Sequence, residues 1–266
     1  MLENLAPYQK DLIETMCEIK AVKFGDFTLK SGRKSPFFVN VGTFSDAKSM
    51  SQLAEAYART IYAEYGGEVT VLFGPAYKAI SIAACVALKL YDLYGVNVRY
   101  CSNRKEAKDH GDTGILVGSK LQDGDKVVIV EDVTTAGTSM EEVVPIIKKY
   151  PGVEILGLVV SIDRQEHGAN KSTTALQEIT KTYGFKTTAI LSMRDDVVPY
   201  LTDNGTLSVG QLWDIDQYYL QYGPKEGADE DSVEETEVAK EEQVACDDVP
   251  CKENKGREED FHGNPT

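Results

Sequence analysis

From residue 69 onward, short apolar runs alternate with segments that have the periodicity of amphipathic helices. Five mainly apolar runs predict buried strands, at 69–73, 96–101, 126–130, 153–162 and 186–191. Three segments between them predict helices, at 79–91, 138–150 and 173–183. Because apolar strands that alternate with helices are typical of sheets buried on both faces, the pattern predicts an α/β fold with a mostly parallel central sheet flanked by helices.

The N-terminal residues predict a smaller substructure. Spaced apolar residues favour an amphipathic helix over 7–20. Two short strands, at 27–30 and 36–41, are separated by the glycine-containing turn 31–34 and predict a hairpin.

Candidate caps mark the start of two further helical regions. Ser45 or Asp46 can accept hydrogen bonds from the first turn of a helix that runs to about residue 64. Residues 193–222 predict helical pieces, and Ser192 is a candidate cap for the first of them.

Acidic residues are concentrated at the C-terminus. The chain of 266 residues has a formal net charge of −15, and residues 224–266 contribute 15 acidic and 5 basic residues to it. The same segment contains no Leu, Ile, Met, Trp or Tyr, so it buries too little apolar surface to offset the entropy of ordering. We therefore expect one globular domain at 1–223 and an acidic, disordered tail at 224–266.

Charge and hydrophobicity exclude several classes of protein. Residues 1–223 still carry 28 acidic against 23 basic residues, which argues against non-specific binding to nucleic acid or to an anionic membrane. No apolar run approaches the roughly 20 residues of a membrane span, and the N-terminus lacks the pattern of a secretory signal. Five cysteines without a Cys-x-x-Cys pair are typical of a reducing compartment, so we expect a cytoplasmic protein.

The segment 127–139 carries the clearest chemical signal. An apolar strand ends in Glu131 and Asp132, small residues follow at 134–138, and a helix is predicted to begin there. In open α/β sheets, ligands bind beyond the carboxyl ends of the strands. Backbone N–H groups of a loop of small residues, together with a helix N-terminus, can surround a phosphate. The two carboxylates can accept hydrogen bonds from sugar hydroxyls or help to hold Mg²⁺, so the motif predicts a site for a ribose 5-phosphate.

Two polar segments allow simpler interpretations. The segment 127–139 also fits an ordinary strand followed by a capped turn, in which Glu131 and Asp132 are solvated. The polar segment 102–119 is either a solvated excursion or a functional lid. The chain has no Walker loop, no Gly-x-Gly-x-x-Gly fingerprint and no His-Glu-x-x-His motif, so none of the chemistries that depend on them is indicated.

Together with four other segments, residues 127–139 resemble the orotate phosphoribosyltransferases, a group of type I phosphoribosyltransferases. The other four segments, in the order that the family has, are 27–36, 73–78, 103–111 and 163–166. The resemblance extends from about Tyr8 to Gly223. It implies the type I phosphoribosyltransferase fold with a small N-terminal hood. The implied reaction uses Mg²⁺ and converts phosphoribosyl diphosphate (PRPP) and orotate to orotidine 5′-monophosphate and diphosphate, a step of UMP synthesis.

The resemblance also implies roles for individual residues. Glu131 and Asp132 take the ribose hydroxyls of PRPP, and Asp132 can contribute to binding Mg²⁺. One continuous loop holds the 5-phosphate: Val133, Thr134, Thr135, Ala136, Gly137, Thr138 and Ser139. The diphosphate is faced by Tyr77 and Lys78 and by four residues of a mobile loop, Arg104, Lys105, Lys108 and His110. Orotate is surrounded by Lys30, Phe38, Val39, Thr135 and Arg164.

Four of these residues are implied to be catalytic: Lys105, Lys108, His110 and Asp132. Negative charge grows on the leaving diphosphate, so basic residues there stabilise the transition state more than the ground state. A mobile loop that closes over the site excludes water, and the planar fork of Arg164 suits the orotate carboxylate. In the family this loop serves the neighbouring subunit, which implies a homodimer.

Two other functions share part of this pattern. A purine-salvage phosphoribosyltransferase has the same 127–139 motif but less use for Lys30 and Arg164. A non-catalytic regulator that senses PRPP would add a basic surface or a DNA-binding segment. Two residues depart from the family pattern, since Thr113 replaces a glycine of the mobile loop and Glu131 replaces the commoner aspartate.

Overall fold

The computed structural model describes residues 5–29, 32–105, 115–133 and 138–225. Its helices are α1 (Pro7–Glu18), α2 (Ala47–Tyr65), α3 (Lys78–Tyr94), α4 (Thr138–Ile147), α5 (Ala175–Tyr183), α6 (Val198–Asp203) and α7 (Val209–Tyr222). Its strands are β1 (Val22–Thr28), β2 (Lys34–Val39), β3 (Val71–Phe73), β4 (Arg99–Asn103), β5 (Leu116–Gly118), β6 (Lys126–Glu131), β7 (Glu154–Asp163) and β8 (Lys186–Ser192). Two further helical turns are η2 (Val41–Thr43) and η3 (Met193–Val197).

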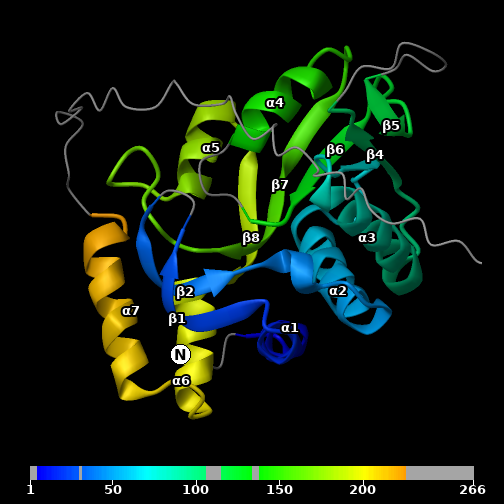
Figure 1. Ribbon diagram of the computed structural model, residues 1–266. Coiled ribbons are helices and arrows are strands. Elements are labelled where there is room, and N and C mark those ends of the chain that lie inside the picture. Colours follow the sequence, from blue (N-terminus) through cyan, green and yellow to red (C-terminus); the bar gives the residue numbers. More distant parts are fainter. Residues whose placement is uncertain (1–4, 30–31, 106–114, 134–137, 226–266) are drawn as a thin grey trace, which may run out of the picture. The chain divides into compact units, whose positions relative to one another are not determined.

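A six-stranded sheet in the order β5–β4–β3–β6–β7–β8 forms the centre of this domain (Figure 1). All neighbouring strands are parallel except β5, which is antiparallel to β4. Along β6, Val128 and Val130 belong to the core shared with α1–α3, whereas Val127 and Ile129 face the core shared with α4 and α5. Alternate residues of one apolar strand therefore serve two helical layers, as expected for a sheet covered on both faces.

The predicted α/β fold is confirmed, with differences at several element boundaries. Asp46 caps α2, because its Oδ1 accepts the Ser49 N–H at 3.0 Å. The side chain of Ser192 makes no such cap bond, and the following turn η3 is a π-helix, so that candidate cap is wrong. Strand β5 was not predicted, because it is only three residues long and lies in a polar segment.

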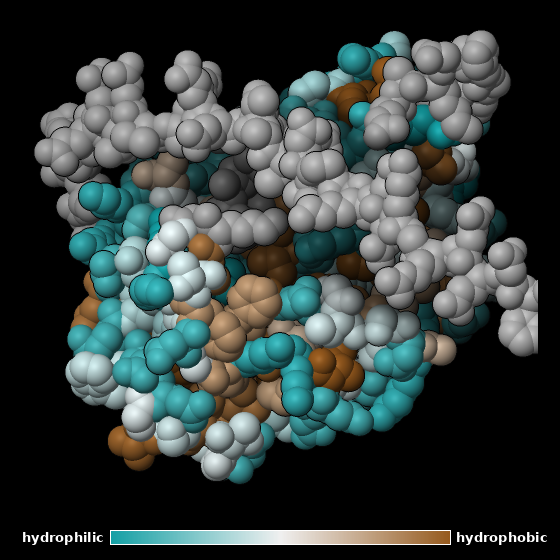
Figure 2. All heavy atoms as spheres, viewed as in Figure 1, coloured by the Kyte–Doolittle hydropathy of each residue, from teal (hydrophilic) through white to brown (hydrophobic). Residues whose placement is uncertain are grey.

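The hairpin of β1 and β2 forms a separate two-stranded antiparallel sheet and is supported by the C-terminal helix. Phe37 of β2 is fully buried, and its ring lies 5.5 Å from the ring of Tyr218 and 6.1 Å from that of Tyr219 on α7. Strand β1 begins at Val22, five residues before the predicted strand, so the hairpin is longer than its apolar pattern indicated. Figure 2 shows apolar residues gathered near the middle of the face seen in Figure 1, with hydrophilic residues around them.

Some sequence-based expectations concern regions that the structure does not test. The predicted tail, apart from residues 224 and 225, lies outside the described residues. Within the described part of the chain, no helix combines the length and the apolar character that crossing a membrane requires.

Candidate active site

Two acidic residues lie at the carboxyl end of the central strand β6, and backbone contacts fix both. The hydroxyl of Tyr57, a fully buried residue of α2, donates to the Glu131 carbonyl at 2.5 Å. The next carbonyl, that of Asp132, accepts the Ser161 hydroxyl at 2.6 Å and the Ser161 N–H at 3.1 Å. Since Ser161 is on the neighbouring strand β7, the turn after β6 is held from both sides.

The two carboxylates have different surroundings. Glu131 is only 7% exposed, and this burial, together with the charge of Asp132, raises its pKa from 4.5 to about 7. A hydrogen bond with the Ser139 side chain acts in the opposite direction. Asp132 Oδ2 lies 3.0 Å from the ammonium of Lys78, which is itself 67% exposed. The site thus combines a buried carboxyl whose pKa is raised with a carboxylate paired to an exposed cation.

The loop that the sequence assigns to the 5-phosphate is described only at its ends. Thr134, Thr135, Ala136 and Gly137 lie outside the described residues. Val133 is half-buried against the core, and α4 begins at Thr138, as predicted. The predicted order of strand, acidic pair and helix is therefore confirmed, while the phosphate contacts stay a prediction.

The loop between β3 and α3 approaches the same edge of the sheet. A Cβ atom on Gly74 would lie 2.2 Å from the Ala79 carbonyl oxygen, so only glycine permits this close approach. The peptide bond between Ala76 and Tyr77 is cis, and Tyr77 is exposed. Lys78 follows as the first residue of α3, which is how it reaches Asp132.

Sequence reasoning missed a polar link that holds this loop. Asn103, at the end of β4, is 1% exposed, and its Oδ1 accepts the Ala76 N–H at 2.9 Å. Its Nδ2 donates to Glu142 Oε1 of α4 at 2.6 Å. One sequence feature could have indicated this link. Asn103 stands at the carboxyl end of a strand, opposite a Gly-Pro loop, where a buried side-chain amide can bind backbone groups.

Two residues at the start of the predicted mobile loop lie beside this link, and one of them joins it. Lys105 pairs with Glu142 Oε2 at 3.5 Å. Arg104 Nε is buried and has no acceptor among the residues that the structure describes, which leaves a donor for an anion. Lys108 and His110 lie outside the described residues.

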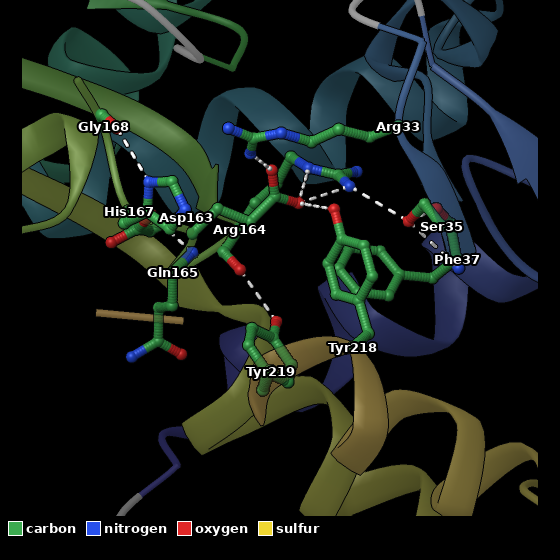
Figure 3. Close-up of polar contacts among 11 residues, drawn as sticks. Arg33, Ser35, Phe37, Asp163, Arg164, Gln165, His167, Gly168, Tyr218 and Tyr219 are labelled. Carbon is green, nitrogen blue, oxygen red and sulfur yellow. Dashed lines mark hydrogen bonds and ion pairs between the residues drawn. The ribbon is translucent and has the colours of Figure 1, made fainter. Parts of the chain in front are cut away.

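Arg164 lies just beyond the carboxyl end of β7 and is buried in a cluster that we call the Glu166 cluster (Figure 3). Its members are Arg33, Arg164, Glu166 and Tyr218. Arg164 Nε donates to Glu166 Oε1 at 2.7 Å, and its Nη2 donates to the Ser35 hydroxyl at 3.2 Å. The guanidinium also stacks on Phe37, with 4.4 Å from Cζ to the ring centroid.

The other predicted orotate residues are placed only in part. Phe38 of β2 is half-buried and its ring stacks on Phe27 at 5.6 Å, while Val39 packs against the core. Lys30 falls in one of the gaps of the described chain. Of the predicted site, the structure brings Lys78 and Asp132 into contact and places Arg164 past the adjacent strand.

Comparison with known proteins agrees with this arrangement. The family model described as "Phosphoribosyl transferase domain" matches residues 40–189. The orotate phosphoribosyltransferase of Clostridium botulinum strain Alaska E43 is 50% identical over 223 residues, which cover 82% of this chain and 99% of that protein. That of Lachnoclostridium phytofermentans is 51% identical over 221 residues, covering 81% and 97%. The crystal structure of orotate phosphoribosyltransferase from Francisella tularensis is similar with a TM-score of 0.70 at 33% identity, covering 80% of this chain and 99% of that one.

Proposed function

Because this chain belongs to the orotate phosphoribosyltransferase family, we propose that it transfers the 5-phosphoribosyl group of PRPP to orotate. The products are orotidine 5′-monophosphate and diphosphate, and the step serves UMP synthesis. The observation that carries the proposal is the edge of the sheet where Glu131, Asp132 and Lys78 meet, with Asp132 and Lys78 3.0 Å apart. Acceptors for sugar hydroxyls thus lie beside a donor for a diphosphate.

The cations of the site are free to change partners when PRPP binds. The Lys78 ammonium is largely exposed, and an exposed ion pair is worth only about 0–1 kcal/mol. Lys105 is similarly half-exposed in its pair with Glu142. A diphosphate that gains negative charge as it leaves attracts these two cations more strongly than their present partners do, and Arg104 Nε offers it a further donor, which lowers the barrier. Lys108 and His110 are expected to join them.

The carboxylates stabilise the sugar as its anomeric carbon becomes cationic. Glu131 and Asp132 accept hydrogen bonds from ribose hydroxyls, and their backbone carbonyls are already fixed by Tyr57 and Ser161. Because the backbone that carries the two carboxylates is fixed, the carboxylates need little reorganisation during the reaction. Such preorganisation is the main source of electrostatic catalysis.

The residues present fit a Mg²⁺ ion that arrives with PRPP. No group of three His, Cys, Asp or Glu side chains suited to a metal occurs among the described residues. Mg²⁺ in phosphate-transfer sites commonly takes one or two carboxylates, and phosphate oxygens and water complete its shell. Asp132 would supply such a carboxylate, and the ion would neutralise part of the diphosphate charge.

The base is selected by Arg164. Its buried guanidinium suits the carboxylate of orotate, and a purine base has no carboxylate. An ultraviolet assay with orotate, uracil, adenine and hypoxanthine tests this assignment. We expect orotate alone to be consumed, and only when PRPP and Mg²⁺ are both present. Turnover of a purine instead of orotate would refute the proposal.

Lys108→Ala and His110→Ala should lower kcat more than they raise KM for orotate.

A homodimer is supported by exposed apolar residues of α3 and β4, and we propose that its subunits share the predicted mobile loop. Leu88 and Tyr91 of α3 are 67% and 61% exposed, and Tyr100 of β4 is 45% exposed. Solvent-facing apolar groups of this size favour an interface with a second chain.

Mixing two inactive variants tests whether the loop acts in the neighbouring site. Lys108→Ala disables the loop and Asp132→Asn disables the sugar site, so a mixed dimer has one intact site only if the loop acts between subunits. We expect mixing to restore about a quarter of wild-type activity, because random exchange gives half mixed dimers. No recovery despite subunit exchange would place the loop in its own subunit's site.

A further inference from the structure

The two oxygens of the Glu166 carboxylate are divided between two arginines. Oε1 accepts Arg164 Nε at 2.7 Å and the Tyr218 hydroxyl at 2.8 Å, and it lies 2.5 Å from Arg164 Nη2. Oε2 faces Arg33 Nη1 at 3.3 Å. Glu166 therefore meets Arg164 with one oxygen rather than in the two-oxygen fork that arginine and carboxylate pairs often adopt.

This division leaves the Nη1 end of Arg164 available. Within the described residues, Arg164 Nη1 has no hydrogen-bond acceptor, while Nε and Nη2 are taken by Glu166 and Ser35. If Arg33 were absent, Oε2 would lose its partner and Glu166 would pair with Arg164 alone, on the edge formed by Nε and Nη2. Arg33 thus shares the negative charge of Glu166, which would otherwise neutralise the guanidinium that a substrate carboxylate needs.

The cluster also keeps a surplus positive charge in a largely buried place. It contains two guanidinium groups and one carboxylate, and the side chains of Arg33, Arg164 and Glu166 are 28%, 7% and 12% exposed. Aromatic faces line it, with Tyr222 4.9 Å from the Arg33 guanidinium carbon. The neighbouring carboxylate of Asp163 is not a member of the cluster, and its Oδ1 accepts the Gln165 N–H at 2.8 Å. A surplus charge away from water acts more strongly on an anion than an exposed one does.

We propose that Arg33 is a positioning residue for the base: by pairing with Glu166 it leaves the positive charge of Arg164, whose Nη1 end is available, to the carboxylate of orotate. This inference rests on the proposed function, in which Arg164 meets orotate. Arg33 comes from the hairpin turn, 133 residues away in sequence from Glu166. Its charge then acts through Glu166 and Arg164 rather than by contact with the substrate.

Steady-state kinetics of Arg33→Gln tests the proposal against a matched control. The neighbouring Lys34→Gln removes the same charge, but the Lys34 ammonium binds the Thr28 hydroxyl outside the cluster. We expect Arg33→Gln to raise KM for orotate about tenfold, with kcat and KM for PRPP nearly unchanged, and Lys34→Gln to raise it less than about twofold. Arg33→Lys should stay within about threefold of wild type, because an ammonium still pairs with Glu166.

Product inhibition separates this role from a merely structural one. Orotidine 5′-monophosphate and uridine 5′-monophosphate differ by one carboxylate. Arg33→Gln should weaken inhibition by the first about tenfold and leave inhibition by the second unchanged. An equal loss for both nucleotides would overturn the inference, because the defect would then not concern the carboxylate.

A double variant restores the charge of the cluster without Arg33. Arg33→Gln with Glu166→Gln leaves Arg164 as the single charge, so the net charge is again positive by one. We expect KM for orotate to return to within about threefold of wild type, a strong non-additivity. A double variant that folds and keeps a tenfold higher KM would overturn the inference even if the single variant fails to fold. Wild-type protein that does not consume orotate would refute the proposed function itself, which distinguishes the two failures.

Discussion

Replacing Glu131 by glutamine should make the protein more stable above neutral pH and less able to bind PRPP. Burial beside Asp132 raises the pKa of Glu131 from 4.5 to about 7. A carboxyl whose pKa is raised by folding stabilises the folded state fully below its unfolded pKa, and this contribution is lost as pH rises through the folded pKa. The pH window of the effect therefore runs from about 4.5 to about 7.

The magnitude follows from the same two pKa values. Ionising Glu131 in the folded chain costs about 3 kcal/mol more than in the unfolded chain, at about 1.4 kcal/mol for each pH unit between them. Glu131→Gln removes this cost, because an amide stays neutral. The gain of the variant over wild type should grow by about 2.5 kcal/mol between about pH 5 and about pH 8.

Urea unfolding followed by circular dichroism, at one protein concentration, measures this difference. The exposed Glu154→Gln provides the control, because it removes a carboxylate that is not buried. A Glu131→Gln difference that is constant with pH would refute the reasoning, because the buried carboxyl would then not carry the ionisation cost. The same variant should raise KM for PRPP about tenfold or more, since a hydrogen bond to a charged acceptor is worth about 1.5–3 kcal/mol.

Three further predictions concern contacts around the site and the tail. Tyr57→Phe leaves the buried carbonyl of Glu131 without its donor and should lower the free energy of unfolding by about 1–3 kcal/mol, measured by the urea midpoint; an unchanged midpoint would contradict this. Asn103→Ala breaks the link between Ala76 and Glu142 and should lower kcat about tenfold, and steady-state rates equal to wild type would show that the link is dispensable. Deleting residues 226–266 should leave kcat within about twofold of wild type, since every residue proposed for the site precedes residue 224; a collapse of activity would assign the tail a catalytic role.

The sequence was sufficient to predict elements whose signal is local. The run at 126–130 contains mainly apolar, β-branched residues, which suit a strand buried on both faces, and β6 is there. The acidic pair that follows was predicted to lie at the edge of the sheet, and Glu131 and Asp132 do so. Strand β5 has too few residues for a pattern, and its pairing with β4 depends on contacts across the loop.

Contacts between segments that are far apart in the sequence could not be predicted from the sequence pattern. Arg33 has the local pattern of a turn charge, and its partner Glu166 becomes evident only when the hairpin packs beside the segment that follows β7. Asn103 and Glu142 are joined in the same way, by the meeting of β4 with α4. Burial also decides the electrostatics of Glu131, because nothing in the motif itself indicates that Glu131 is buried more deeply than Asp132 or that Asp132 pairs with a lysine.

Among the described residues, the hairpin shares no strand pairing with the six-stranded sheet. Different parts of the chain are therefore proposed to bind the base and the sugar phosphate. The sheet edge carries the residues proposed for the sugar and the diphosphate, whereas the hairpin and α7 surround the guanidinium proposed for the base. Exchange of the hairpin together with α7 could therefore alter which nucleobase is accepted while the sugar chemistry is inherited intact. Divergence of base preference on a constant catalytic platform would then need changes in only the hairpin, α7 and the residues that directly follow β7.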